Sequence, residues 1–533
     1  MKMLCADLVF RNGQVITVNP QDEICSAIAV KGTEILYVGT DAEASEFIGE
    51  NTKVIDLEGR SLVPGFIDSH VHYFQTGAQQ LEVDCTHLTT IAQIKEKVRQ
   101  AAAVTPKGEW IRGCQYNEDI IEDGRFINRW DIDEVAPDHP VAIVRYGYHT
   151  SILNSKALAL AGVDDYAPDE VGGEFHRERG MVNGVCHEAC HFNHSKVFDY
   201  QPSEYEKVFQ IADKFFASMG VTSVHDAGGN GKFQLQTLID MDARKMLNTR
   251  VYMFTYSLSE NRKLYEDLLP TGIHTGFGSD RLRIGANKVM LDGSSNTPSA
   301  SVREPYCHIN DKGLLSMDQD ELNAIYVESN RAGFQNTAHA VGDNAVDMVL
   351  IAHEKALNDY PREDARHRIE HCAIIDDDMI ERIKRLGVTP SLQPIFMYEQ
   401  GERYLKFYGE DRVSRMMAAR TMLDAGIIAS MGTDCPVYYS HPMINMYAAC
   451  TRISKKGREI SPEQKVTVLE ALRMYTLNSA YASYQEDSLG SLEVGKLADL
   501  AVLSKPILSI EPEELKDIVV DFTISGGKII YEG

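Results

Sequence analysis

The sequence predicts an α/β protein: a (β/α)₈ TIM barrel with an inserted subdomain, plus a small β-sandwich domain built from both ends of the chain. Three observations predict this fold. Eight β-like runs alternate with amphipathic helices along the middle of the chain, a long gap separates the first two of these runs, and both chain ends consist of short strands and turns. Alternating strands and helices are typical of a parallel sheet or barrel.

The candidate barrel strands are short runs of apolar and β-branched residues. They are predicted at 63–70, 221–226, 251–256, 282–291, 336–340, 367–371, 388–392 and 427–433. Helices are expected between them at 205–219, 318–332, 343–357, 376–386 and 412–425. Eight such strands favour a closed barrel.

The gap after the first barrel strand is far too long for one helix. About residues 80–200 must therefore hold the inserted subdomain, with candidate strands at 110–115 and 141–146. At the chain ends, β-rich runs occur at 7–10, 15–18, 27–31, 34–38, 53–56, 500–503, 519–524 and 528–531. Neither end alone is long enough for a stable sheet. We therefore expect one composite β-domain from residues 1–60 and 485–533, and a barrel domain over 61–484.

The charge of the chain restricts its partners. With 533 residues and a formal net charge of −25, the protein lacks the basic surface that nucleic acid or an anionic membrane requires. A small-molecule substrate is the expected partner, and a homodimer is the default expectation for the oligomeric state.

The apolar runs and the cysteines predict a cytoplasmic location. No apolar run reaches the roughly 18 residues of a membrane span. Asp7 and Arg11 interrupt the first apolar stretch, unlike a signal peptide. The ten cysteines include no Cys-x-x-Cys pair, so reduced, buried thiols are expected.

The strongest motif lies at the end of the first predicted barrel strand, where residues 64–72 read PGFIDSHVH. His70 and His72 are two positions apart, which places both imidazoles on one face of a strand. At the end of a barrel strand that face points into the mouth, where both could bind one metal ion. Read alone, a His-x-His pair also occurs by chance.

The same kind of side chain ends three further predicted strands. His339 follows the run NTA, His371 follows RIE, and Asp434 follows SMGT. Each alone would more often be a core histidine or a helix-capping aspartate. Four strand ends that all carry metal-ligand side chains predict a metal centre.

Lys288 lies inside a fifth apolar strand, which is costly for an unpaired charge. One solution is carboxylation by CO₂, which gives an anionic carbamate with two oxygens that can bridge two metals. The alternative is a neutral or salt-bridged lysine, with Asp292 as the candidate partner.

These motifs resemble the amidohydrolase superfamily, and within it the YtcJ-like group that includes N-substituted formamide deformylases. The similar segments are 64–72, 220–226, 288–293, 339–346, 366–371, 391–394 and 490–500. The resemblance implies a bound metal ion at His70 and His72 and a second at His339 and His371. The resemblance also assigns Lys288, which as its carbamate would bridge the two ions.

The resemblance also places Asp434 beside the first metal and the attacking water. One local departure is that the group often has GSDWP where residues 432–436 read GTDCP. The smaller Cys435 should change the pocket shape more than metal binding.

The expected reaction is hydrolysis of a non-peptide carbon–nitrogen bond in a small molecule, such as an N-acyl or N-formyl amine. Metal binding lowers the pKa of water from 15.7 toward roughly 7, and Asp434 is predicted to act as general base and then acid. Two zinc ions are the first expectation, although manganese, iron or cobalt suit the same ligands. The candidate substrate-binding residues are His149, Trp110, Tyr306 and Gln393.

Two other functions stay open at this point. Deamination of a small heterocycle uses a similar fold, but such deaminases usually carry a histidine–glutamate pair around the fifth strand, and here His339 is followed by AVG. A non-catalytic barrel that binds a metal or metabolite and regulates is the other alternative. The complete set of candidate ligands argues against it.

Overall fold

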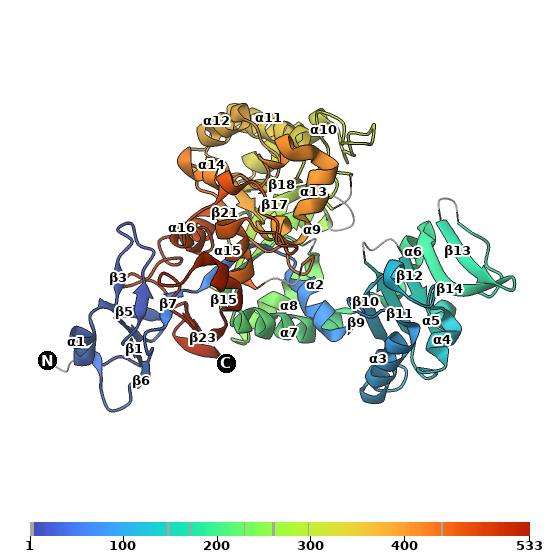
Figure 1. The fold of residues 1–533 in the computed structure, drawn as a ribbon, viewed down its shortest axis with the longest axis horizontal. Coiled ribbons are helices and arrows are strands. Elements are labelled where there is room, and N and C mark those ends of the chain that lie inside the picture. The colour runs from blue at the N-terminus through green and yellow to red at the C-terminus, as the bar shows by residue number, and fades with distance from the viewer. Residues whose placement is uncertain are drawn as a thin grey trace. The chain divides into compact units, whose positions relative to one another are not determined.

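A computed structural model describes residues 5–146, 150–170, 173–228, 230–257, 262–296, 298–438 and 441–533. The chain divides into two compact units, one of residues 1–73 and 213–533 and the other of residues 74–212. Figure 1 shows both units as ribbons. Within the described ranges, no helix combines the length and the apolar character needed to cross a membrane.

An eight-stranded parallel sheet forms the centre of the first unit, as the sequence predicts. Its strands are β8 (Phe66–Val71), β15 (Val221–Asp226), β16 (Arg250–Tyr256), β17 (Leu282–Met290), β18 (Asn336–Ala340), β19 (Arg368–His371), β20 (Thr389–Leu392) and β21 (Ser430–Met431). The edge strands β8 and β21 meet through a parallel bridge between Val71 and Cys435. This contact nearly closes a TIM-type barrel.

Helices α10 (Gln319–Arg331), α11 (Asp343–Asp359) and α12 (Asp377–Leu386) lie side by side on the outside of the barrel (Figure 1). They agree closely with three of the predicted helices. The prediction of one helix over 412–425 is wrong: α13 (Ile395–Val413) ends there, and α14 (Ala419–Asp424) begins after a break. In the break, Met416 forms a bridge with Ile374, a tertiary contact that helical periodicity does not show.

Two predicted barrel strands are shorter than expected. The run 427–433 holds only β21, and the run 63–70 is divided at Gly65 between β7 (Ser61–Pro64) and β8. A Cβ atom on Gly65 would lie 2.3 Å from the Thr222 hydroxyl oxygen, so only glycine fits at this crossing. The Gly65 amide donates instead to the carbonyl of Asp499 at 2.8 Å.

Two further sheets lie near the chain ends, the first built from N-terminal strands alone and the second from both ends. One has the order β5-β4-β1-β6, and the other has the order β24-β23-β22-β7-β2-β3. Their strands are β1 (Leu8–Arg11), β2 (Gln14–Ile16), β3 (Ile24–Cys25), β4 (Ala27–Lys31), β5 (Glu34–Gly39), β6 (Lys53–Asp56), β22 (Leu500–Leu503), β23 (Val520–Ser525) and β24 (Lys528–Glu532). The two sheets share a buried apolar cluster that includes Phe10, Leu62 and Leu500.

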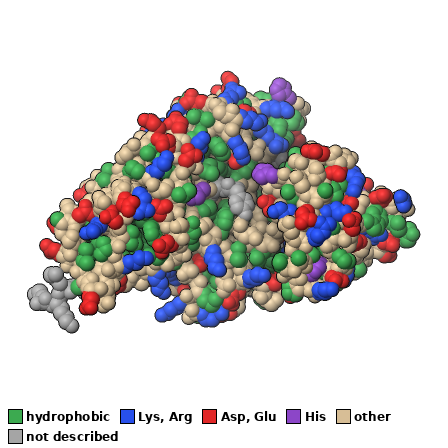
Figure 2. Space-filling view, turned by 60° about the horizontal axis from the view of Figure 1, so that its bottom comes forward, with side chains coloured by type: hydrophobic (Ala, Val, Ile, Leu, Met, Phe, Trp, Pro, Cys, Tyr) green, Lys and Arg blue, Asp and Glu red, His purple; other side chains and the backbone are tan. Residues whose placement is uncertain are grey.

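A buried ion pair connects the barrel to these sheets. Arg250 at the start of β16 donates from Nε and Nη2 to the two carboxylate oxygens of Asp499, at 2.8 and 2.9 Å. Both side chains are only 4% exposed. Elsewhere charge is dispersed: Figure 2 shows acidic and basic side chains interspersed over the visible face.

The second unit is built on a mixed sheet with the order β13-β14-β12-β11-β10-β9. These strands are β9 (Val83–Asp84), β10 (Ile111–Tyr116), β11 (Val141–Arg145), β12 (Thr150–Leu153), β13 (Gly173–Glu178) and β14 (Met181–Glu188). The two strands predicted in the insertion correspond to β10 and β11. The domain boundaries expected from the sequence stay predictions.

Three rings are buried together beside β19. His353 of α11 is stacked on His367, with ring centroids 4.8 Å apart, and the Tyr326 ring lies 4.9 Å away. Nε2 of His353 donates to the carbonyl of Arg368 at 3.1 Å. Burial lowers the pKa of His353 to about 3.

Replacing His353 by glutamine should reduce the acid sensitivity of the fold. The imidazole stays neutral in the folded protein but takes up a proton in the unfolded chain below about pH 6.5, so acidification lowers the free energy of unfolding. Glutamine can keep the hydrogen bond to Arg368 but cannot titrate. In urea unfolding, the stability lost between about pH 7.5 and about pH 5 should shrink by about 2 kcal/mol. An equal loss in both proteins would contradict this assignment.

Candidate metal centre

The six residues predicted as metal ligands come together at the carboxyl ends of the barrel strands. His70 lies in β8, Lys288 in β17, His339 in β18 and His371 at the end of β19. His72 directly follows β8, and Asp434 is the third residue after β21. Parallel strands bring such ends to one edge of the barrel. Their roles as ligands stay predictions, and the geometry below shows what they can do.

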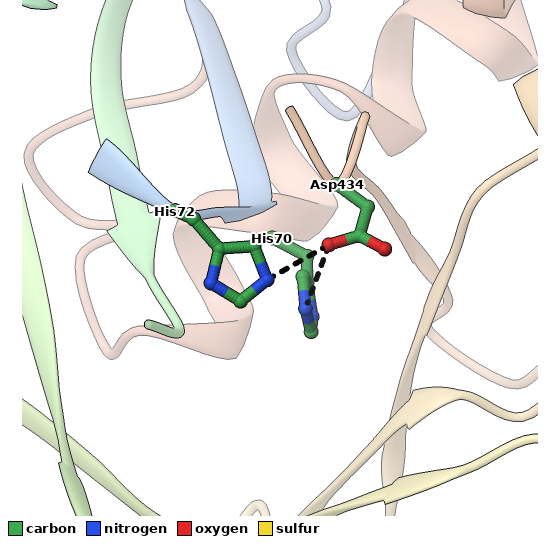
Figure 3. Close-up of side chains that lie close together, drawn as sticks. All are labelled: His70, His72 and Asp434. Carbon is green, nitrogen blue, oxygen red and sulfur yellow. Dashed lines mark ion pairs between the residues drawn. The ribbon is translucent and has the colours of Figure 1, made fainter. Parts of the chain in front are cut away.

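His70, His72 and Asp434 form the tightest group. One ligand atom from each lies within 4.8 Å of the other two. Figure 3 shows the Asp434 carboxylate beside the two imidazoles, with Oδ1 3.1 Å from His72 Nε2 and 3.5 Å from His70 Nε2. The side chain of His70 is fully buried and that of His72 is 27% exposed, so the group opens to solvent on the His72 side.

The backbone holds Asp434 in this position. The residue has φ near 60°, and its amide donates to the carbonyl of His70 at 2.7 Å. The amide of His72 in turn donates to the carbonyl of Cys435 at 2.8 Å. The turn after β21 is therefore fixed directly against the His-x-His segment.

Lys288 and His371 lie against His70, and His339 lies against His371. The Lys288 amine lies 3.4 Å from Nε2 of His70 and donates to the carbonyl of Ala227 at 3.2 Å. The ring of His371 lies 4.9 Å from that of His70 and 4.5 Å from that of His339. The six predicted side chains are thus connected through pairwise contacts, and among the described residues His70, His72 and Asp434 bring their ligand atoms within 4.8 Å of one another.

Lys288 shows no ion pair with a carboxylate among the described residues. Its pKa is lowered, chiefly by burial. The carboxylate of Asp292, its expected alternative partner, instead accepts backbone hydrogen bonds from Ser301 at 3.0 Å and Gly342 at 2.9 Å. A buried amine of this kind is the form of lysine that can react with CO₂.

The donor set fits a divalent metal. Burial lowers the pKa of His70 to about 4 and that of His371 to about 3, so both imidazoles are neutral and can offer lone pairs. Burial opposes ionisation of Asp434, but the imidazoles of His72 and His70 outweigh it and hold its pKa well below the usual range. A buried anionic oxygen beside neutral imidazoles suits a cation.

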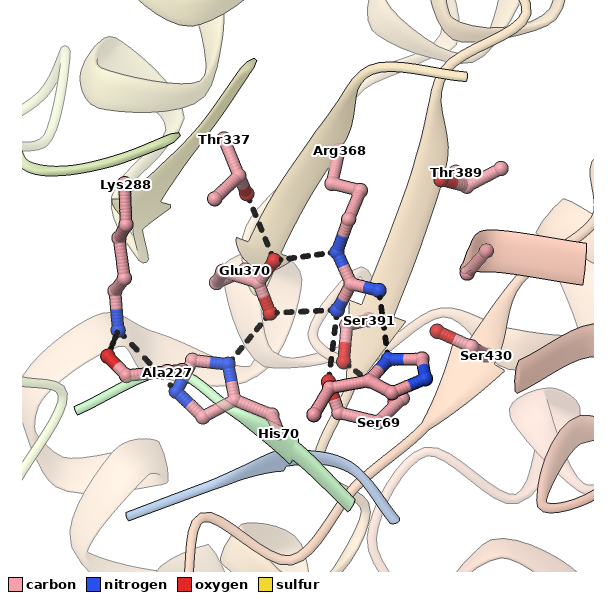
Figure 4. A network of polar contacts seen from close by, with 12 residues as sticks. Ser69, His70, Ala227, Lys288, Thr337, Arg368, Glu370, Thr389, Ser391 and Ser430 are labelled. Carbon is pink, nitrogen blue, oxygen red and sulfur yellow. Dashed lines mark hydrogen bonds and ion pairs between the residues drawn. The ribbon is translucent and has the colours of Figure 1, made fainter. Parts of the chain in front are cut away.

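The sequence reasoning missed a buried layer beneath these residues, shown in Figure 4. Nδ1 of His70 lies 2.5 Å from Oε2 of Glu370. Arg368 donates to both oxygens of Glu370, at 2.8 and 3.1 Å, and Thr337 donates to one of them at 2.7 Å. The signal was present, because an arginine and a glutamate two positions apart on an apolar strand share one face.

The predicted substrate-binding residues have separate surroundings. Gln393 is buried, and its Oε1 lies 2.7 Å from Nδ1 of His371. Tyr306 is buried against Tyr408, with ring centroids 5.3 Å apart. Trp110 packs on Phe198 within the second unit. His149 lies outside the described residues, and the substrate roles of all four stay predictions.

Three residues that the sequence did not single out form a chain of contacts that begins at His371. The ring of Phe396 stacks on that of His371 at 5.8 Å, and Tyr438 packs against Phe396 at 5.3 Å. The hydroxyl of Tyr438 donates to Oδ1 of Asn296 at 2.8 Å. All three follow barrel strands in loops or at a helix start, where no periodic pattern exists to indicate them.

Residues 53–531 match the family described as "Amidohydrolase family". This chain belongs to the amidohydrolase family. Among its relatives, an N-substituted formamide deformylase of Arthrobacter pascens is 29% identical over 99% of this chain and 98% of its own length. The putative amidohydrolase YtcJ of Bacillus subtilis is 27% identical over 98% of this chain and 99% of its own length. The resemblance inferred from the motifs is thereby confirmed.

A solved relative gives this amidohydrolase a structural counterpart. The crystal structure of an uncharacterized metal-dependent hydrolase from Pyrococcus furiosus is 26% identical, with a TM-score of 0.78. The match covers 95% of this chain and 99% of that one. The similarity therefore extends over nearly the full length of both chains.

Proposed function

We propose that this amidohydrolase hydrolyses an amide-type carbon–nitrogen bond in a small molecule, such as an N-acyl or N-formyl amine, and requires a divalent metal. The observation that carries the proposal is the approach of His70, His72 and Asp434 to within 4.8 Å of one another. The names of two relatives support it, because one is an N-substituted formamide deformylase and one a metal-dependent hydrolase.

Two metal ions, with zinc as the first expectation, would be held by these residues. His70 and His72 would hold one ion, His339 and His371 the other, and Lys288 as its carbamate would bridge them. A bound divalent ion would lower the pKa of water and polarise a carbonyl oxygen.

The residues of the chain would then move the proton. Asp434 accepts the proton of the water that attacks the carbonyl carbon and returns it to the nitrogen as the carbon–nitrogen bond breaks. Phe396, packed on His371, would form one wall of the substrate pocket.

Metal removal tests the proposal. Chelation should abolish amine release from a panel of N-formyl and N-acyl amines, and added zinc or manganese should restore it. His72→Ala should lose metal and activity, whereas His87→Ala, the same change at an exposed histidine, should keep both. Ammonia release from small heterocycles would point to a deaminase instead. Bound metal with no turnover on any substrate would point to a regulator.

We also propose that the two terminal sheets are the β-sandwich domain expected from residues 1–60 and 485–533. Their shared apolar cluster supports this proposal.

A further inference from the structure

Glu370 lies in the barrel interior, and its carboxylate makes four hydrogen-bonding contacts with buried neighbours. Its side chain is completely buried, as is that of Arg368. Arg368 donates to both carboxylate oxygens, Thr337 donates to Oε1, and Nδ1 of His70 lies against Oε2. A carboxylate so placed is held by charge-assisted hydrogen bonds and has little freedom to move.

These contacts determine which nitrogen of His70 carries the proton. Oε2 of Glu370 is an acceptor, because it also accepts a hydrogen bond from Arg368, so Nδ1 of His70 must donate. A neutral imidazole protonated on Nδ1 has its lone pair on Nε2. In its uncarboxylated form Lys288 agrees with this tautomer, since its amine lies 3.4 Å from Nε2.

The lone pair faces the centre of the candidate site. Nε2 of His70 is also the atom that lies 3.5 Å from Oδ1 of Asp434. A ring turned over about its Cβ–Cγ bond, or protonated on Nε2, would direct a proton at the position of a cation. His371 has a weaker version of this contact, because its Nδ1 meets only the neutral amide oxygen of Gln393.

We propose that Glu370, held by Arg368 and Thr337, is a positioning residue that fixes His70 as the Nδ1-protonated tautomer with Nε2 directed at the metal. This inference rests on the proposed metal-dependent function. Groups that hydrogen-bond a ligand histidine in this way typically contribute about 10–100-fold to metal affinity. Glu370 touches no reacting atom, so its effect should appear in metal binding as well as in turnover.

Glu370→Gln tests the proposal in the full-length protein. The amide has the same shape, but its NH₂ group faces a nitrogen of Arg368 at either oxygen position, so the charge-assisted contacts are lost. At the Oε2 position the NH₂ group would also donate to Nδ1 of His70 and stabilise the wrong tautomer. We expect zinc affinity, measured by competition with a chromophoric chelator, to fall about 10–100-fold. The visible spectrum of the cobalt-loaded protein should change as well, because the ligand geometry changes.

Glu370→Asp is the second variant and is chosen to fold. It keeps a negative charge beside Arg368 but withdraws the carboxylate from His70 by about one bond length, about 1.5 Å. Zinc affinity should therefore fall here too. Asp499→Asn is the matched control, since it removes a carboxylate from an equally buried arginine pair that touches none of the candidate ligands. Its zinc affinity should stay within about threefold of the wild type, even where its Tm falls.

The outcomes separate the two proposals. Glu370→Gln or Glu370→Asp protein that is folded and binds zinc as tightly as the wild type overturns the positioning role. A loss of affinity equal to that of Asp499→Asn also overturns it, because the effect would then be general destabilisation. A wild-type protein that binds no divalent metal overturns the proposed function itself.

Discussion

Replacing Asp434 by asparagine should lower kcat by about 10²–10⁴-fold, the usual contribution of a general acid–base group. Asparagine keeps the shape of the side chain and can still offer an oxygen beside His70 and His72, but it cannot accept the proton of the attacking water. Metal content, measured by elemental analysis, should remain close to that of the wild type.

Asp213→Asn serves as the control for this experiment. Asp213 is also buried, and it accepts hydrogen bonds from the backbone of Asn248 and Thr249. This variant should retain its kcat while losing some stability. If Asp434→Asn keeps the kcat of the wild type and its metal content is unchanged, Asp434 does not transfer the proton.

The second large effect concerns stability. Arg368→Met should lower the free energy of unfolding by about 3–5 kcal/mol, because it leaves the buried Glu370 carboxylate without its cation. Chemical denaturation and Tm would measure the loss. Methionine fills a similar volume, so the change reports on charge more than on packing.

A double variant shows where that loss comes from. Arg368→Met combined with Glu370→Leu removes both charges and should be clearly more stable than Arg368→Met alone. The expected loss for a broken buried pair is larger than about 1 kcal/mol. If the free energy of unfolding of Arg368→Met alone lies within about 1 kcal/mol of the wild type, Glu370 is not held as an anion.

The predicted ligands could be identified from sequence because of a property of parallel barrels. His70, His339, His371 and Asp434 each end or follow a strand, and strand ends of one direction must meet at one edge. Their approach to one another therefore needs no knowledge of loops. The positions of most barrel strands follow from local patterns, although β21 is shorter than predicted and the first run is divided at Gly65.

The remaining features depend on contacts between residues far apart in the chain. Arg368, two positions away, indicates a buried pair, but Glu370 meets a histidine 300 positions away, and nothing near it in the sequence indicates that contact. The division of the first strand at Gly65 depends on the Thr222 side chain, and the end of α13 depends on a bridge to Ile374. Such contacts follow from packing, which hydrophobic periodicity does not describe.

The crossing at Gly65 has a consequence for how the protein is made. β7 pairs with β22 near the far end of the chain, and β8, which carries His70, begins only one residue after β7. A growing polypeptide on the ribosome therefore exposes the His-x-His segment long before β22, the partner of the adjoining β7, has been synthesised. We expect the centre to acquire metal only after translation has passed this point, late in the life of the nascent chain.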